Sequence, residues 1–111
     1  MSDHRTGAFV VQHRYRVDPS AREKLLHLLA LIRLHALDLG IAQFEAWIDD
    51  ADPWLVSEVH SYDSWSQYQR LGAKALPAEM EDVYGDLERL IEGGLGGIQT
   101  HAWNVVHLPD L

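Results

Sequence analysis

Three of the seven histidines lie in the middle of segments that alternate like β-strands, where the backbone would hold an imidazole in a fixed position. His13 lies in FVVQHRYRV, His60 in WLVSEVHSY and His101 in IQTHAWNVVHL. Histidine is the side chain best suited to moving a proton near neutral pH. We therefore treat His13 and His60 as candidate general bases. The alternative is that each is a core or interface residue held by a single hydrogen bond.

Aromatic residues in and next to these segments are candidate walls of a ligand site. Tyr15 lies two residues after His13, and side chains two apart on a strand share a face. Trp65 lies in SYDSWSQYQR, at the expected start of a helix. A small polar site inside an apolar pocket is typical of ligand-binding sites. Trp65 can instead be a packing residue that fills the gap between helix and sheet. We expect the ligand to contact Tyr15, Trp65, Tyr68, His101 and Trp103.

The sequence contains no motif for a metal or an organic cofactor. It has no cysteine, which excludes thiolate ligands, and its histidines show neither HxH nor HExxH spacing. The glycine-rich run GGLGG follows a predicted helix instead of opening one, so it cannot hold a phosphate at a helix N-terminus. We expect no cofactor.

Charge and hydropathy limit the partners. Seventeen acidic residues against nine basic ones give a net charge of −8, which would repel the phosphates of a nucleic acid. No apolar run approaches the roughly 18 residues that a membrane span needs, and the N-terminal MSDHRTGAF does not resemble a signal peptide. We expect no nucleic-acid or membrane partner and a cytoplasmic location.

The pattern of apolar residues predicts one domain, over residues 8–108, of the 111 in the chain. Strand-like alternation covers 9–17, 41–49, 54–62 and 98–108. A long helix is predicted from the DPS signal at 18–20 to Gly40, a short helix begins after Asp63 or Ser64, and another helix follows Pro77.

The order strand, helix, strand, strand, helix, strand predicts an α+β fold of the ferredoxin-like βαββαβ plan. Its four-stranded antiparallel sheet carries helices on one face. The first and third strands are central neighbours in this plan, so His13 and His60 can lie side by side. The bare face of the sheet needs a cover, and a second copy of the chain supplies one, which predicts a homodimer. We expect that face to carry Val10, Phe44 or Trp47, Val59 and Val105, with Arg14 and Glu58.

Three short motifs, YRVDP at 15–19, DDADP at 49–53 and YDSW at 62–65, resemble the dimeric α+β barrel superfamily that contains the antibiotic biosynthesis monooxygenases. The chain is also similar to the domain appended to some major facilitator exporters. The resemblance covers about residues 10–106 and implies a homodimer, a dimeric α/β barrel, with a small cavity between sheet and helices in each subunit. Some members oxidise electron-rich aromatics with O₂ and no metal or flavin, and others degrade haem. Trp65 matches a tryptophan that recurs at this helix start. The stretch LGAKAL at 71–76 lacks the histidine that active members often have there, so the resemblance carries over no haem ligand.

Two functions remain open at this stage. The first is a cofactor-independent monooxygenase-like enzyme acting on a small aromatic or polyketide-like compound, with His13 or His60 as the base. The second is a non-catalytic dimeric module that binds a small ligand or a partner through the same fold. If the protein is an enzyme, we expect His13 and His60 to lie within hydrogen-bond reach of a common cavity, whereas a binding module should have a cavity without a titratable group.

Overall fold

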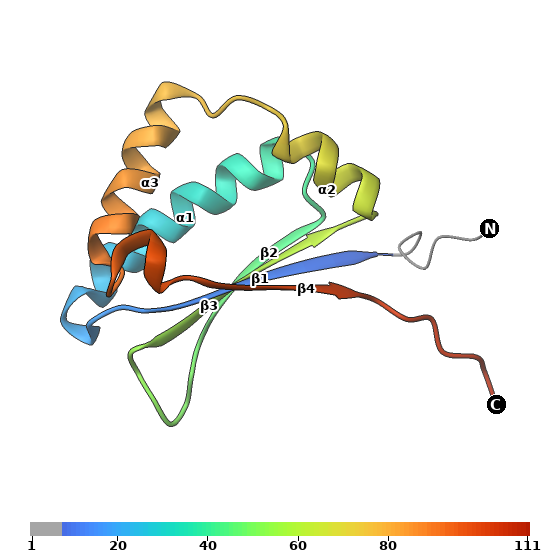
Figure 1. Cartoon of the computed structure of the whole chain (residues 1–111), viewed down its shortest axis with the longest axis horizontal. Helices are drawn as coiled ribbons and strands as arrows, with labels where there is room; N and C mark the ends of the chain where they lie inside the picture. The colour runs from blue at the N-terminus through green and yellow to red at the C-terminus, as the bar shows by residue number, and fades with distance from the viewer. Residues whose placement is uncertain (1–7) are drawn as a thin grey trace.

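The computed structural model describes residues 8–111 (Figure 1). The prediction that the chain lacks a signal peptide concerns residues that lie almost wholly outside this range. Four strands alternate with three α-helices and two short 3₁₀ turns, η1 and η2, in a βαββαβ order. The elements are β1 (Phe9–Arg16), η1 (Pro19–Ala21), α1 (Arg22–Asp38), β2 (Gln43–Ile48), β3 (Leu55–Tyr62), α2 (Trp65–Gly72), α3 (Ala78–Leu90), η2 (Gly94–Gly97) and β4 (Gln99–Asn104).

The four strands form one antiparallel sheet in the order β2-β3-β1-β4. All three α-helices lie on the same side of it, and the other side is bare (Figure 1). The predicted ferredoxin-like α+β fold is therefore confirmed, with β1 and β3 at the centre of the sheet. Within residues 8–111, no helix is both long and apolar enough to cross a bilayer.

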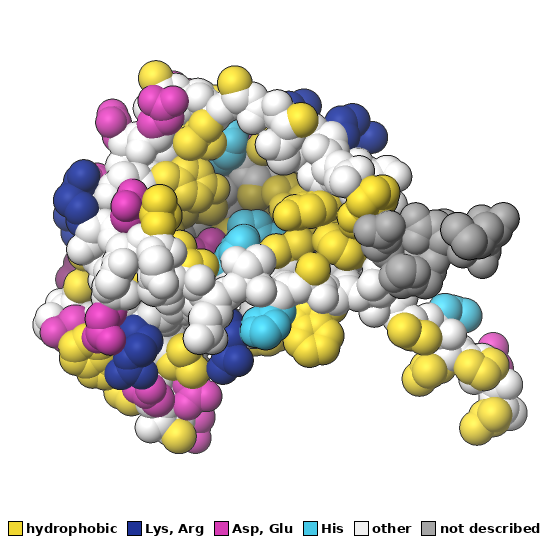
Figure 2. Space-filling view, viewed as in Figure 1, with side chains coloured by type: hydrophobic (Ala, Val, Ile, Leu, Met, Phe, Trp, Pro, Cys, Tyr) yellow, Lys and Arg dark blue, Asp and Glu magenta, His cyan; other side chains and the backbone are white. Residues whose placement is uncertain are grey.

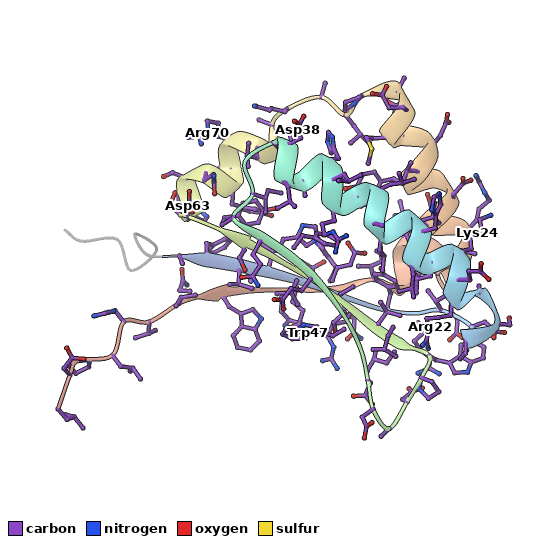
Figure 3. All side chains as sticks on the ribbon, turned by 180° about the vertical axis from the view of Figure 1, so that it is seen from behind. Arg22, Lys24, Asp38, Trp47, Asp63 and Arg70 are labelled. Atoms are coloured by element: carbon purple, nitrogen blue, oxygen red, sulfur yellow. The ribbon has the colours of Figure 1, made fainter. Side chains whose placement is uncertain are left out.

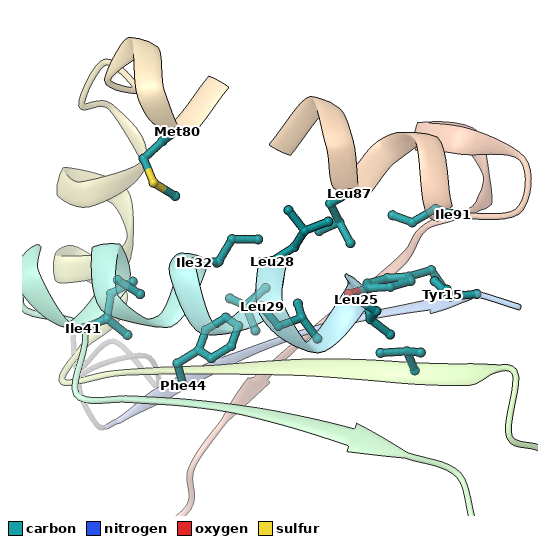
Figure 4. Packing of buried hydrophobic residues seen from close by; sticks show 14 of the residues in the cluster. Tyr15, Leu25, Leu28, Leu29, Ile32, Ile41, Phe44, Met80, Leu87 and Ile91 are labelled. Atoms are coloured by element: carbon teal, nitrogen blue, oxygen red, sulfur yellow. The ribbon is translucent and has the colours of Figure 1, made fainter. Parts of the chain in front are cut away.

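The core lies between the sheet and the helices (Figure 4). Val11, Tyr15 and Val17 point into it from β1 and its end, each with only 2% of its surface exposed. The apolar stripe of α1 packs onto them, because leucines and an isoleucine recur every three or four residues and so share one face of the helix. Its buried members are Leu25, Leu28, Leu29, Ile32 and Ala36.

Local signals at the helix ends act as the sequence indicates. Gly40 adopts φ 95° just after α1, a conformation that favours glycine. The Ser64 side chain caps α2 by accepting a hydrogen bond from the Gln67 amide nitrogen. Gln67 is itself buried, and its side chain donates to the Gly40 carbonyl at 3.0 Å, so the start of α2 is joined to the end of α1.

The last strand is shorter than the predicted 98–108. Its final paired residue, Asn104, lies opposite Phe9, the first residue of β1. Val105 adds one hydrogen bond, from its amide nitrogen to the Ala8 carbonyl at 3.0 Å. β4 therefore ends where β1 begins, and residues 106–111 extend away from the body (Figure 1).

On the bare face, the structure decides between Phe44 and Trp47 in favour of Trp47, and it corrects the placement of Glu58. Phe44 and Glu58 are buried on the helix side, because Phe44 pairs with His60 and Glu58 pairs with His13. The alternation then places Trp47 on the bare side, as Figure 3 shows. The register puts Val10 and Val59 on that side with it.

Candidate functional site

His13 and His60 lie side by side on the helix face of the sheet, as the order of the strands implies. Their ring centroids are 5.3 Å apart and the rings are perpendicular. On its other side, His60 packs edge to face against Phe44, at a centroid distance of 4.7 Å. The His60 ring is thus fixed between two neighbouring rings and has little freedom to turn.

A buried carboxylate, Glu58, lies next to these rings. Its Oε1 is 3.2 Å from Nε2 of His60, and its Oε2 accepts a hydrogen bond of 2.5 Å from the Tyr15 hydroxyl. Only 5% of the Glu58 surface is exposed. A buried charge is expensive unless it is paired and hydrogen-bonded, and here each carboxylate oxygen has a partner.

This pairing favours one tautomer of the neutral His60 ring. An ionised carboxylate only accepts hydrogen bonds, so Nε2 of His60 carries the proton that it donates to Glu58. In the neutral ring, Nδ1 then holds the free lone pair and can accept a proton. The nearby carboxylate stabilises the imidazolium that forms, which is the division of roles that a general base with an orienting acid uses.

His13 is held differently. Its Nδ1 lies 2.9 Å from the Thr100 hydroxyl of β4, and the side chain is half-buried. Burial lowers the pKa of His13 below the ordinary 6.5, and His60 lowers it further, while Glu58 acts in the opposite direction. His13 is therefore a neutral neighbour of the Glu58–His60 pair.

The pKa of His13 predicts a pH-dependent stability. A depressed pKa in the folded state means that the unfolded chain binds more protons, so the free energy of unfolding falls as the pH drops below about 6.5. We expect His13→Gln to weaken this pH dependence and His107→Gln, at the exposed chain end, to leave it unchanged. Urea unfolding at pH 7.5 and pH 5 measures it. Equal pH dependence in wild type and His13→Gln would contradict the assignment.

A cavity of about 180 Å³ opens next to His60, between the sheet, α1, α2 and α3. Most of its lining is apolar, and Figure 2 shows a hollow on this side of the molecule with hydrophobic and histidine side chains inside it. The lining residues are His35, Ala36, Leu39, Ile41, His60, Tyr62, Leu71, Gly72, Lys74, Ala75, Leu76 and Tyr84. His13 is not among them, so of the two candidate bases His60 alone lines this cavity.

Two tyrosines in this lining keep their protons. Burial, with smaller contributions from Tyr68 and Tyr84, raises the pKa of Tyr62 to about 12. Burial and then the Glu58 carboxylate raise the pKa of Tyr84. Both hydroxyls are therefore neutral hydrogen-bond donors near pH 7.

A larger groove, of about 560 Å³, lies on the outside of the molecule between α1 and the edge strand β2. Leu26, Leu29 and Trp47 are among its lining residues, and neither His13 nor His60 is. It lacks a buried proton acceptor, so we assign the chemistry to the smaller cavity beside His60.

The aromatic residues predicted to contact a ligand are distributed differently from the expectation. Tyr15 is fully buried behind Glu58, and its burial and that carboxylate raise the pKa of its hydroxyl. Tyr68 stacks against Phe9 and Tyr62, with centroids 5.2 and 5.1 Å apart, and Trp65 packs against the core. None of the three belongs to the cavity lining, so Tyr15 supports the site from behind while Trp65 and Tyr68 hold α2 on the sheet.

His101 and Trp103 lie on the bare face and not with the other candidates. They pair with Gln12 and Val10 of β1, whose side chains point away from the helices. Their rings lie 6.4 Å apart, and 55% of the Trp103 surface is exposed. The sheet therefore separates them from the cavity.

Sequence reasoning missed several residues of the site. Glu58 could have been found by alternation, because it lies two residues before His60 on β3 and its side chain must therefore lie on the same face of the sheet. Tyr62 follows from the same rule. Tyr84 and Lys74 come from α3 and from the segment between α2 and α3, and no motif marks them. Among residues 8–111, no three acidic or histidine side chains gather as a metal site requires.

No protein-family model matches the sequence, and no curated protein matches it either. Solved structures do match. One named "Putative antibiotic biosynthesis monooxygenase from Nitrosomonas europaea" superposes with a TM-score of 0.72 at 9% identity, covering 96% of this chain and 95% of that chain. A similarly named structure from Caulobacter crescentus superposes with a TM-score of 0.70 at 10% identity, and the match covers 93% of each chain. Another, from Chloroflexus aurantiacus, superposes with a TM-score of 0.65 at 15% identity, and the match covers 94% of this chain and 98% of that chain. At these identities the likeness concerns the fold, and the chain has the ferredoxin-like α+β fold of these structures.

Proposed function

We propose that the protein is a cofactor-independent monooxygenase-like enzyme that oxidises a small aromatic or polyketide-like phenol with O₂. The observation that carries this proposal is the Glu58–His60 pair, joined at 3.2 Å, with His60 at the wall of the cavity. An apolar cavity with a positioned base suits removal of a proton from a bound phenol. The fold shared with structures named as monooxygenases is consistent with this activity, although fold alone does not assign one.

The proposed reaction balances with O₂ as its only oxidant. Transfer of the phenolic proton to His60 leaves a phenolate, which is electron-rich enough to react with O₂. A C–O bond forms between a ring carbon and O₂, and the resulting peroxide anion takes the proton back from His60. The hydroperoxide then loses water, with cleavage of the O–O bond and loss of the hydrogen on that carbon, to give a quinone. One phenol and one O₂ thus become one quinone and one water.

The volume of the cavity limits the size of the substrate. An enclosed apolar cavity of about 150 Å³ can hold benzene, so the cavity of about 180 Å³ beside His60 accommodates one aromatic ring. A compound with two or more fused rings must extend out through the mouth. Single-ring phenols are therefore the first compounds to test.

Turnover in air tests the proposal directly. The purified full chain is incubated with phenol, 2-methoxyphenol and 3-hydroxybenzoate, while an oxygen electrode follows O₂ and absorbance follows the quinone. We expect one O₂ consumed per quinone formed, above the rate without protein. Binding detected by NMR with no O₂ uptake for any of the three would overturn the enzyme and support the non-catalytic binding module.

We also propose that residues 8–108 fold as one domain that works as a homodimer, with the bare sheet faces of two copies in contact. Val10, Trp47, Val59 and Trp103 line an apolar depression of about 360 Å³ on this face. Arg14 belongs to the same face, and its Nε is buried without a hydrogen-bond partner among the described residues. A two-fold contact would cover the apolar side chains and bring an acceptor to Arg14.

The expected mass of the wild type is twice the 12.6 kDa of one chain. Trp103→Glu places a charge on an exposed position of the edge strand β4, where the monomer does not need the indole, so we expect it to give the monomer. Leu34→Glu, on the outer surface of α1 where 64% of the leucine is exposed, is the matched control and should remain dimeric. Light scattering at micromolar concentration distinguishes these results, and a wild type of 12.6 kDa would rule out the dimer.

A further inference from the structure

Most of the polar groups that line the cavity beside His60 can donate hydrogen bonds to a ligand. They are His35, two tyrosines that keep their protons, and one lysine, whereas His60 donates to Glu58 and presents its lone pair. The chain has seventeen acidic residues, yet none of those described lines this cavity. A cavity without carboxylates in so acidic a chain favours a ligand that accepts hydrogen bonds or carries negative charge.

Glu58 does not line this cavity. Both of its oxygens already have partners, the Tyr15 hydroxyl and the His60 ring. They are therefore not available as hydrogen-bond acceptors for a ligand. Its effect on the cavity is to favour protonated neighbours, as the raised pKa of Tyr84 shows.

Lys74 supplies the positive charge. It lies just after α2, in the segment that leads to α3, and it is exposed while it lines the cavity. This position puts the lysine at the rim, with the aliphatic residues Leu71, Ala75 and Leu76 next to it. No salt bridge joins Lys74 to a carboxylate within residues 8–111. Its ammonium group is thus available to an anion at the mouth.

We propose that the ligand is a small aromatic acid, whose ring fills the apolar part of the cavity and whose carboxylate binds Lys74 at the mouth. This inference deepens the proposed function, on which it rests for the phenol hydroxyl beside His60. The substrate class is then a hydroxylated aromatic carboxylic acid. Tyr62 and Tyr84 donate to its oxygen atoms, and the ring lies against the aliphatic lining.

Benzoate and benzamide test the charge preference without any turnover. The two probes have nearly the same shape, differ in charge, and lack the phenolic hydroxyl that the proposed reaction requires. We expect the full-length wild type to bind benzoate about tenfold more tightly than benzamide in NMR or calorimetric titrations at low salt, and 1 M NaCl to reduce the difference. Lys74→Gln should lose about fivefold in benzoate affinity and keep its affinity for benzamide.

Lys24→Gln is the matched control, because Lys24 is an exposed lysine of α1 that does not line the cavity (Figure 3). It removes the same charge from the chain and should leave benzoate binding unchanged. Equal affinity for the two probes in the wild type, no effect of Lys74→Gln, or binding of neither probe would overturn this inference. Benzoate selectivity together with a failure to oxidise any phenol would instead sink the proposed oxygenase activity alone.

Discussion

Replacing His60 with glutamine is expected to lower the rate of phenol oxidation by about 10²- to 10⁴-fold, the usual contribution of a positioned general base. Glutamine retains a donor for Glu58 and fills a similar volume, so the buried carboxylate keeps a partner. It cannot take up a proton at neutral pH. The loss should therefore fall on the rate of the chemical step, while the affinity for the ligand changes little.

The matched control for this variant is His27→Gln. His27 is an exposed histidine of α1 that does not line the cavity. Its replacement should therefore leave the chemical step within a few-fold of wild type. Glu58→Gln gives a third measurement, because its amide can still accept from Tyr15 but no longer balances the charge of the imidazolium, so we expect a reduced rate with binding intact.

Rates from the oxygen electrode and dissociation constants from NMR titration separate the two effects. Circular dichroism must show each variant folded, since His60 and Glu58 are both buried. A His60→Gln protein that oxidises phenols as fast as wild type would eliminate His60 as the base. His13 could not simply replace it, because its Nδ1 is already engaged with Thr100 and it is absent from the cavity lining.

Much of the fold follows from short-range patterns. Residues 9–17 alternate with the period of two that a strand has, and the leucines of α1 recur with the period of a helix over several turns. The apolar face of each element is therefore unambiguous. Gly40 ends α1 through its backbone conformation, and Ser64 begins α2 through a side-chain hydrogen bond. Both effects are local. The strand order then follows, because few topologies join these elements without crossing connections.

The site is harder to predict, for two physical reasons. On β3, polar residues occur on both faces, so hydropathy alone did not reveal which side Glu58 takes. Glu58 and His60 are two residues apart on one strand, so they must lie on the same face. The prediction that Glu58 lies on the bare face conflicted with this rule. The second reason is that the cavity depends on how α3 and the segment before it pack over the sheet. Tyr84 and Lys74 reach it from elements with no strong motif of their own.

The face on which His101 lies could not be predicted from its own strand. Alternation within β4 shows which residues share a face with His101, but which side of the sheet that face is on depends on the register with β1. The pairing of Gln12 with His101 decides the matter, and this register is a long-range property of the sheet. Trp103 follows His101 to the bare face for the same reason. Both residues belong to the proposed dimer contact and not to the ligand cavity.

Gly97→Ala is expected to be the most destabilising glycine-to-alanine change within residues 8–111. A Cβ at this position would lie 2.0 Å from the carbonyl oxygen of Glu92, far inside van der Waals contact. Neither side can yield easily, because the Glu92 amide nitrogen donates to the Arg16 carbonyl at 2.8 Å and Ile91 is bridged to Val17. Relief of the clash would therefore pull on the junction between α3 and β1.

We expect this substitution to cost about 3 kcal/mol of unfolding free energy, at the upper end for overpacking, and to lower Tm by more than about 10 °C. Gly96→Ala is the matched control one residue away, since a Cβ there meets nothing within 4 Å. It should be neutral, or stabilise slightly by restricting the unfolded chain. Thermal and urea unfolding of the two variants measure the difference. If both variants retain wild-type stability, the turn at 92–97 can relax without disturbing β1, and the predicted clash at Gly97 would be contradicted.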